Sequence, residues 1–396
     1  MLSPLASAPH PPRAMVRGAG PAGSLAALAL ADAGWSVRLI DPSPPSRLQA
    51  SRRAYAFTQS SARLLRRLGL WESLGPVLHP FRRLELVDLG ARRGCPLQSA
   101  DLWGRRAGPS PVGWIGEHSA LMAVLLERLE AHPAIEVHLG ASPPSADAPG
   151  EDEADLIVAA DGSLSPTREA LAIGLWRRPY GQHCLTTQVT LRGAPPEMAW
   201  ERLRPEGPFA LLPLSRGRFQ VVWSAPAWRC RQLESLSSTA FLDALAPILP
   251  PGLDITSMEE PPRVFPVRLQ LARRLHRGRT ILLGETAHRC HPVGGQGLNL
   301  SWRDVAVLHR LAERVQAGRL PLDRLGGSYS RRRWPDLVLT LLITDGLVRL
   351  FSNRHPLVLP LRGVTLRVVA RSSLLRRCLL GVMTNGPCQP IQPAAT

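Results

Sequence analysis

The chain has 396 residues, of which 44% are apolar, so it is long enough for two packed domains and too apolar for a disordered protein. Its 48 basic residues are all arginine and exceed its 31 acidic residues, which gives a net charge of +17. This excess predicts an anionic partner, and we favour an anionic membrane surface because no nucleic-acid-binding motif is present. An apolar run of about 18 residues, as a transmembrane helix needs, is absent. The six cysteines form no CxxC pair, which argues against a disulfide framework and predicts no metal site.

The N-terminal segment predicts the first part of a nucleotide-binding fold. Residues 1–13 are rich in proline and predict a disordered N-terminus. Residues 14–41 then read as a strand, a glycine-rich turn, a helix of small residues and a second strand. One residue departs from this pattern, because Arg17 stands where the first strand should be apolar.

The glycine-rich turn has the spacing GxGxxG, formed by Gly18, Gly20 and Gly23, and Asp41 ends the second strand. The first glycine allows a tight turn, the second admits a pyrophosphate to the helix N-terminus, and the third lets helix and strand pack closely. The carboxylate of Asp41 can accept the ribose hydroxyls of an adenine dinucleotide. Together these features predict dinucleotide binding.

The next 120 residues mix helical and strand-like patterns. Ser60–Leu70 predicts an amphipathic helix, Leu84–Leu89 a strand, and Ile115–Leu129 a helix with an apolar stripe. Residues 142–153 predict a surface loop. A buried strand, Leu156–Ala160, then ends at an Asp-Gly pair.

That pair, Asp161 and Gly162, has two interpretations. Asp-Gly after a strand is usually a turn. At the carboxyl end of a doubly wound sheet, the same carboxylate can face a cofactor.

Residues 175–274 have a different pattern, with short alternating segments separated by Gly and Pro turns. The clearest are Cys184–Leu191, Phe209–Leu214 and Phe219–Ser224, which predict an antiparallel sheet in an inserted second domain. The chain then returns to the first domain at a buried strand, Thr280–Leu283.

A second glycine-rich turn follows that strand, and Gly295 and Gly297 precede a helical pattern over Leu298–Leu311. Backbone N–H groups at such a helix N-terminus can approach an anion, and the helix dipole favours negative charge there. The alternative is a tight strand-to-helix turn with no ligand. The turn lies at the junction of the two predicted domains, where ligand pockets commonly form.

The C-terminal part predicts helices with Leu and Val stripes interleaved with arginine, and Asn353–Met383 contains no acidic residue. Such helices would lie on anionic lipid headgroups. Core helices with a solvated face are the alternative.

The patterns together divide the chain into five predicted parts. Residues 1–13 are disordered, 14–174 and 275–328 form the nucleotide-binding domain (with about 80–112 belonging to the second domain), 175–274 form the substrate-binding sheet, and 329–396 are helical and membrane-associating.

Three motifs stand in order: GAGPAG from Gly18, ADGSLSPTR from Ala160, and GETAHRCHPVGGQGLNLSWRD from Gly284. Together they resemble the class A flavoprotein aromatic hydroxylases of the para-hydroxybenzoate hydroxylase fold. The match is closer to the UbiH/VisC-like hydroxylases of ubiquinone biosynthesis, which pair His-Pro with GQGLNL. The resemblance extends to AWERLRPEGPFALLPL, YGQ and TDGLVRLFS, and covers nearly the whole chain. It implies an α/β fold in which a doubly wound, Rossmann-like FAD-binding domain carries an inserted antiparallel substrate domain and a helical C-terminal region.

The resemblance also implies roles for individual residues. The residues expected to bind FAD are Gly18, Gly20, Gly23, Asp41, Arg53, Asp161, Gly162, Glu285, Gly297, Leu298 and Asn299. The residues expected at the catalytic face of the flavin are His291, Pro292, Gly295 and Gln296. His288 and His291 are the nearest groups for proton handling, but each is more typical of a structural histidine. Glu285 stands where the family has Asp.

The activity that the resemblance implies is FAD-dependent monooxygenation. NAD(P)H or another donor would reduce FAD, O2 would add to form a flavin hydroperoxide, and this would hydroxylate a polyprenylated phenol or quinone precursor. The alternatives are a prenyl-chain flavin reductase of the same fold, and a degenerate flavoprotein scaffold of a quinone-biosynthesis complex, which Arg17 and Glu285 suggest. We expect a cytoplasmic protein, peripheral on the inner face of a membrane.

Overall fold

The computed structural model describes residues 10–103, 110–140, 153–353, 355 and 358–389. Most of the predicted surface loop at 142–153 and the first nine residues lie outside these ranges. Strand β1, Arg13–Arg17, begins at the last residue of the segment predicted to be disordered, because that residue already pairs with Ser36.

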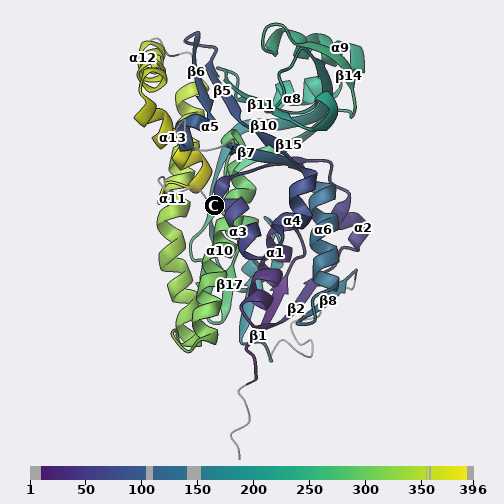
Figure 1. Cartoon of the computed structure of the whole chain (residues 1–396), viewed down its shortest axis with the longest axis vertical. Coiled ribbons are helices and arrows are strands. Elements are labelled where there is room, and N and C mark those ends of the chain that lie inside the picture. The colour runs from purple at the N-terminus through teal and green to yellow at the C-terminus, as the bar shows by residue number, and fades with distance from the viewer. Residues whose placement is uncertain (1–9, 104–109, 141–152, 354, 356–357, 390–396) are drawn as a thin grey trace, which may run out of the picture.

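A six-stranded sheet forms the lower half of the molecule in Figure 1, in the order β16-β17-β9-β1-β2-β8. Five strands are parallel and only β16 is antiparallel, as a doubly wound fold requires. Arg17 does not disrupt it, because this residue ends β1, and its Nη1 lies 3.5 Å from Thr167 Oγ1. The strands other than β1 are β2 Ser36–Asp41, β8 Ile135–Leu139, β9 Leu156–Ala159, β16 His276–Arg277 and β17 Thr280–Leu282.

A nine-stranded sheet lies above it, in the order β18-β15-β10-β13-β12-β11-β5-β6, with β14 paired to β10. The sheet is not wholly antiparallel as predicted. β5 pairs parallel to β11, which is possible because β5 comes from an earlier part of the chain and no hairpin joins the two. The strands are β5 Arg83–Asp88, β6 Arg93–Gln98, β10 Leu175–Arg192, β11 Met198–Leu203, β12 Phe209–Pro213, β13 Arg218–Pro226, β14 Asp254–Met258, β15 Arg263–Ala272 and β18 His288–Arg289.

A small antiparallel sheet, β3-β7-β4, connects the two larger ones. Its strands are β3 Ala54–Phe57, β4 Leu78–Phe81 and β7 Gly113–Glu117. The helix predicted from Ile115 therefore begins later, at His118, because Ile115 pairs with β3 and β4 on its two sides. A central strand explains the apolar run there as well as a helix does.

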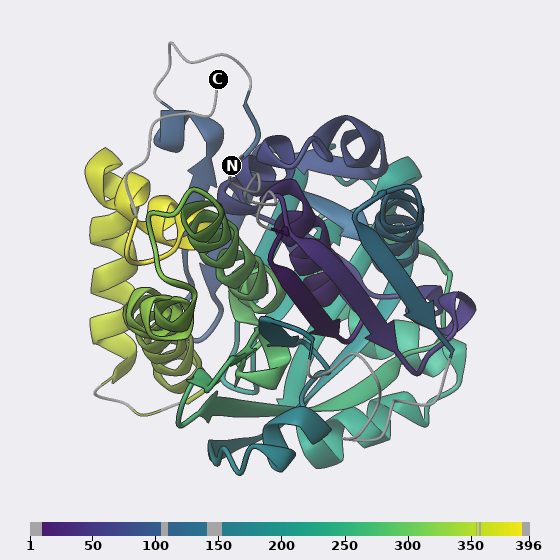
Figure 2. The same cartoon turned by 90° about the horizontal axis from the view of Figure 1, so that it is seen from below.

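Helices cover the sheets, and three of them form the C-terminal region along one side of the molecule (Figures 1 and 2). Those three have buried inner faces: Val348, Phe351, Leu366 and Leu380 share one apolar cluster with residues of β5 to β7. In the described ranges, no helix is both long and apolar enough to cross a membrane. The helices are α1 Pro21–Asp32, α2 Pro45–Gln49, α3 Gln59–Arg67, α4 Trp71–Leu74, α5 Ser99–Trp103, α6 His118–Glu130, α7 Pro166–Ala170, α8 Ala227–Glu234, α9 Ser238–Leu245, α10 Gln296–Gln316, α11 Leu325–Phe351, α12 Val358–Arg371 and α13 Ser373–Asn385.

A buried carboxylate fixes helix α10 to its surroundings. Asp304 accepts hydrogen bonds from Gly284 N (2.9 Å), His288 Nε2 (2.7 Å) and Arg333 Nε (2.6 Å). Burial alone would raise the pKa of Asp304, but the charges of His288 and Arg333 together lower it to about 2. Arg333 also donates to Asp336 at 2.7 Å, so one network joins α10, α11 and the turn after β17.

We therefore expect Asp304→Asn to lower the free energy of unfolding by about 3–5 kcal/mol, because it leaves Arg333 buried without its charge partner. Urea unfolding monitored by circular dichroism measures the change. Asp254→Asn is the matched control, since its pair with Arg192 is 65% and 75% exposed and should contribute less than about 1 kcal/mol. Equal losses in the two variants would contradict this account.

Candidate functional site

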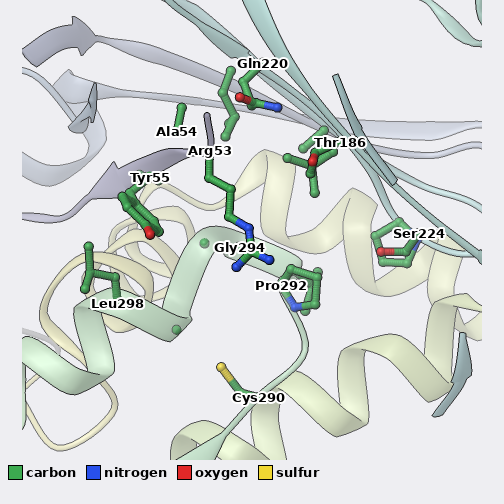
Figure 3. Close-up of a pocket in the computed structure, with 18 of the residues that line it drawn as sticks. Arg53, Ala54, Tyr55, Thr186, Gln220, Ser224, Cys290, Pro292, Gly294 and Leu298 are labelled. Atoms are coloured by element: carbon green, nitrogen blue, oxygen red, sulfur yellow. The ribbon is translucent and has the colours of Figure 1, made fainter. Parts of the chain in front are cut away.

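A cavity of about 240 Å³ lies between the nine-stranded sheet and the glycine-rich turn that precedes α10. Figure 3 shows Thr186, Gln220 and Ser224 projecting into it from the sheet, opposite Pro292, Gly294 and Leu298. The cavity thus forms at the domain junction, as the sequence predicts.

The sheet wall of the cavity is built from one face of four adjacent strands. Register places Glu201 of β11 beside Ala210, Ala210 beside Val222, and Val222 beside Thr186. All four line the cavity, because they occupy equivalent positions on neighbouring strands and point to the same side. Small side chains at Ala210 and Val222 leave room for a flat ligand.

The opposite wall is the turn Val293–Gly295 and the first turn of α10. Gly294 and Gly295 have positive φ angles of 67° and 60°, which favour glycine. A Cβ on Gly295 would lie 2.8 Å from the Cβ of Ala56, so only glycine fits beside β3. The first turn of α10 contains no acidic residue, so its free N–H groups present positive potential to the cavity.

Asn299 anchors this turn to β3. Its Nδ2 donates to the carbonyl oxygens of Ala56 (2.6 Å) and Gly295 (2.8 Å), and its Oδ1 accepts from Thr58 N (3.0 Å) and Ser61 Oγ (2.7 Å). The side chain is fully buried and its hydrogen bonds are all internal. Asn299 thus positions the turn Val293–Gly295, which we call the flavin-side turn after the cofactor that the sequence predicts.

His291 and Gln296, two of the predicted catalytic residues, lie behind the cavity wall. His291 accepts a hydrogen bond from Val293 N at its Nδ1 (3.1 Å), and its Nε2 lies 3.0 Å from Gln182 Oε1. Burial lowers the pKa of His291 to about 3, so the ring is neutral at physiological pH. Gln296 donates to the carbonyl oxygens of Gly294 and Met383, both at 3.0 Å. In this arrangement both side chains hold the turn in shape, while Pro292 and Gly295 line the cavity itself.

The N-terminal glycine-rich turn has the geometry that its spacing predicts. A Cβ on Gly18 would lie 2.3 Å from the carbonyl oxygen of Ala160, and one on Gly23 would lie 1.9 Å from that of Gly18. A Cβ on Gly20 would meet no atom within 4 Å. Two glycines are thus required by packing, and the third leaves open space at the N-terminus of α1, where the predicted pyrophosphate would lie.

Asp41 is placed beside this turn, where its carboxylate accepts from Ala19 N and Ser43 N, both at 2.7 Å. It therefore braces the loop, and its predicted contact with the ribose stays a prediction.

Asp161 and Gly162 lie beside the turn that follows β17. Thr286 Oγ1 donates to Asp161 Oδ1 (3.1 Å) and accepts from Gly162 N (3.0 Å). The buried Arg168 donates to the carbonyl oxygens of Ser163 and Thr286. The structure thus joins the second and third sequence motifs through Thr286 and Arg168, which sequence reasoning had not assigned a role.

Arg53 and Glu285 both line this cavity. The guanidinium of Arg53 lies 4.4 Å from the ring centroid of Phe265, and Figure 3 shows it extending toward Gly294 and Pro292. Glu285 is 53% exposed and lies 3.7 Å from Arg289. The longer side chain of Glu285 therefore reaches into open space rather than into the core.

These features fit an FAD molecule. The backbone at Gly20, Gly294 and Gly297 has room for a ligand beside it, because a Cβ at each would meet no atom within 4 Å. Two helix N-termini, of α1 and α10, offer free N–H groups without acidic side chains in their first turns. The negative charge of a dinucleotide suits these two helix N-termini. The flat shape of a flavin ring suits the space between the two cavity walls.

Sequence reasoning missed the sheet wall. The polar cavity residues Thr186, Glu201, Gln220 and Ser224 were unassigned, although strand alternation places Gln220 and Ser224 on one face of β13. Which face meets the flavin-side turn depends on domain packing, and the strand pattern alone does not define it.

Comparisons with known proteins agree with this geometry. A family described as FAD binding domain matches residues 13–335. The chain is 34% identical over 401 residues to the ubiquinone hydroxylase UbiL of Rhodospirillum rubrum, covering 95% of this chain and 91% of that protein. It is 28% identical to the 3-demethoxyubiquinol 3-hydroxylase of Escherichia coli, covering 93% of this chain and 97% of that protein.

The fold is that of solved FAD-dependent monooxygenases. The p-nitrophenol 4-monooxygenase PnpA of Pseudomonas putida superposes with a TM-score of 0.75 at 18% identity, covering 95% of this chain and 99% of that one. HpxO of Klebsiella pneumoniae, solved as its R204Q variant with FAD, gives a TM-score of 0.72 at 21% identity, covering 95% and 99%.

We predict that Gly20→Ala weakens FAD binding at least about tenfold without unfolding the protein, because its Cβ enters only open space that the pyrophosphate would occupy. Titration of flavin-free protein with FAD, followed by fluorescence quenching, measures the affinity. Gly327→Ala is the control, since its Cβ also meets no atom within 4 Å but lies in α11. Unchanged FAD affinity in Gly20→Ala would contradict the assignment.

Proposed function

Because the chain belongs to the UbiH/VisC-like family of FAD-dependent hydroxylases, we propose that it hydroxylates the aromatic ring of a polyprenylated phenol or quinone precursor in ubiquinone biosynthesis. The observation that carries the proposal is the cavity itself. It brings the glycine-rich turn that precedes α10 against a sheet face that carries the small side chains Ala210 and Val222.

FAD would be held at both glycine-rich turns, with Gly18, Gly20 and Gly23 at the pyrophosphate, and Gly295, Gly297 and Leu298 at the flavin ring. Bound there and reduced by NAD(P)H, FAD would supply the chemistry that transfers one oxygen atom of O2 to the substrate ring. The first turn of α10 stabilises negative charge on the flavin side, because its N–H groups are fixed and its dipole is directed at the cavity. The two walls orient the ring and exclude water.

Part of the cavity lining is apolar, which supports a substrate with a hydrocarbon tail. Phe81, Leu84 and Leu212 line it from the sheets, and Met383 lines it from α13. These side chains would contact the first isoprene units, whose burial stabilises binding by about 25 cal/mol per Å² of apolar surface. The tail would then pass toward the C-terminal helices.

Those helices carry an apolar and basic surface, which we call the C-terminal patch. Eight of the eleven exposed large apolar side chains in the described residues belong to it: Leu339, Leu342, Ile343, Leu350, Val364, Val368, Leu374 and Leu375. Arg367, Arg371 and Arg377 are exposed on the same helices. Apolar side chains beside arginine favour an anionic membrane surface, and this would place the enzyme where its prenylated substrate resides.

The hydroxylation predicts that purified protein binds about one FAD per chain and consumes O2 when a geranylated phenol is added with NAD(P)H. Visible absorption before and after denaturation gives the flavin content, and mass spectrometry detects the product with one added oxygen. A prenyl-chain reductase would instead give product with two added hydrogens and no O2 uptake. A protein that takes up no FAD would support a scaffold role.

The C-terminal patch predicts that a Leu342→Ser/Val368→Ser variant loses about tenfold or more of its affinity for anionic vesicles, because both side chains are at least half exposed and would enter the lipid. Sedimentation with phosphatidylglycerol vesicles measures the bound fraction. Trp228→Ser is the control, since Trp228 is 65% exposed but lies on α8 of the sheet domain.

Removing α12 and α13 altogether would also disturb the core, because Leu366 and Leu380 are buried. Point substitutions separate membrane binding from folding. If the double variant binds vesicles as strongly as the wild-type protein does, the membrane role of the patch is contradicted.

A further inference from the structure

Glu201 is a buried carboxyl group on the sheet wall of the cavity, with 7% of its surface exposed. Its partners on the two neighbouring strands are Leu86 and Ala210, which offer its side chain neither a charge nor a hydrogen bond. On the opposite side, the amide of Gly294 faces the carboxyl group. None of these three facing groups titrates, and the titratable group that does interact with Glu201, the thiol of Cys184, stays protonated because burial raises its pKa to about 12. The carboxyl group therefore bridges the sheet wall and the flavin-side turn.

One oxygen of Glu201, Oε1, has no hydrogen-bond partner in the described part of the chain. Buried structural carboxylates of this protein differ from it: Asp304 accepts from Arg333, and Asp88 lies 2.9 Å from Arg362 Nε. A buried carboxyl without a cation is unfavourable, so a ligand group is the natural partner for Oε1. Burial raises the pKa of Glu201 to about 8, which makes both protonation states accessible near neutral pH.

Other titratable groups that line the cavity are less suited to exchange a proton with a substrate. Burial raises the pKa values of Tyr55 and Cys290 to about 12, so both stay protonated. The Nε2 of His288 lies 2.7 Å from Asp304, in the core network. Glu285 is exposed beside Arg289. Glu201 thus combines burial, a place in the cavity lining and an oxygen without a hydrogen-bond partner among the described residues.

We propose that Glu201 is the acid–base residue that exchanges the proton of the substrate's ring hydroxyl. This inference rests on the proposed hydroxylation. The ionised carboxylate accepts the O–H proton, and the electron pair of that bond stays on the phenol oxygen, which enriches the ring in electrons. One atom of O2 then forms a carbon–oxygen bond with the ring, and the other leaves as water.

The atoms and electrons of this reaction balance with the reactants already named. Two electrons come from NAD(P)H by way of FAD, and the two hydrogens of the water come from NAD(P)H and solvent. The oxygenated ring carbon then loses its proton and the new hydroxyl oxygen gains one, so these two protons cancel. Glu201 returns its own proton to the original phenol oxygen, so the residue ends in its starting state.

The test compares Glu201→Gln, which keeps the shape but removes the acid–base group, with Glu201→Asp, which keeps the group. FAD-loaded proteins are assayed for product formed from a geranylated phenol over a range of pH. We expect Glu201→Gln to lose about 10²- to 10⁴-fold in kcat/KM, with unchanged flavin content. The wild-type kcat/KM should fall about tenfold per pH unit below the pKa of Glu201, and this dependence should persist in Glu201→Asp and vanish in Glu201→Gln.

A ring-fluorinated analogue separates an acid–base role from a structural one. Its more acidic hydroxyl is already ionised at the assay pH, so it needs no base. We expect the loss in Glu201→Gln to shrink to less than about tenfold with this analogue. Glu85→Gln is the matched control on the neighbouring strand β5, outside the cavity lining, and should behave as wild type with both phenols.

Thermal unfolding gives a readout that needs no turnover. Burial raises the pKa of folded Glu201 above the unfolded value of about 4.3, so folded wild-type protein holds a proton that the unfolded chain releases. Wild-type stability should therefore fall relative to Glu201→Gln as pH rises from about 5 to about 8. A Tm difference that is independent of pH in this range would overturn the inference.

The remaining outcomes are also decisive. Wild-type kcat/KM and an unchanged pH profile in Glu201→Gln would overturn the role of Glu201 while leaving the hydroxylation intact. Absence of hydroxylated product from FAD-loaded wild-type protein would instead reject the proposed function. Should Glu201→Gln fail to retain FAD, the Glu201→Asp profile decides, and a profile without the acidic limb would overturn the inference.

Discussion

The network around Asp304 is the constraint on which the site depends. A buried carboxylate that accepts from Gly284, His288 and Arg333 fixes the start of α10 relative to the six-stranded sheet and to α11. Such a buried group is stable only with all its partners in place, so the network allows one arrangement of these elements. The position of the α10 N-terminus at the cavity follows from it, and with it the direction of the positive helix dipole.

Glycines and small side chains then create the space that this framework encloses. Gly18 and Gly23 are packed against backbone, whereas Gly20, Gly294 and Gly297 border open space. The first kind preserves the turn and the second kind admits a ligand. On the sheet side, Ala210 and Val222 leave a flat wall in which Glu201 is the buried carboxyl. The site is therefore a shaped cavity with polar groups at a few fixed points, in which the cofactor supplies the oxygen chemistry.

The sequence predicted local features well where short-range physics decides them. The GxGxxG turn, the parallel strands and the α10 N-terminus follow from glycine conformations and from periods of hydrophobicity, and the structure contains them. The family, with its FAD and its hydroxylase chemistry, followed from motifs in a fixed order. The predictions were wrong where the pairing of strands decides the local structure. Ile115 belongs to a strand because β3 and β4 flank it, and β5 runs parallel to β11, with no hairpin between them to impose an antiparallel pair.

The sequence by itself determined which cofactor class the chain binds, because a phosphate-binding turn is a local structure of a few residues and its glycines are visible in order. Only the tertiary structure decided what those residues face. It placed the neutral His291 behind the wall, joined Asp161 to Thr286, and brought Glu201 opposite Gly294 across 93 positions of sequence. Burial gives Glu201 its raised pKa. Burial is a property of packing between domains, and no local pattern of residues encodes it.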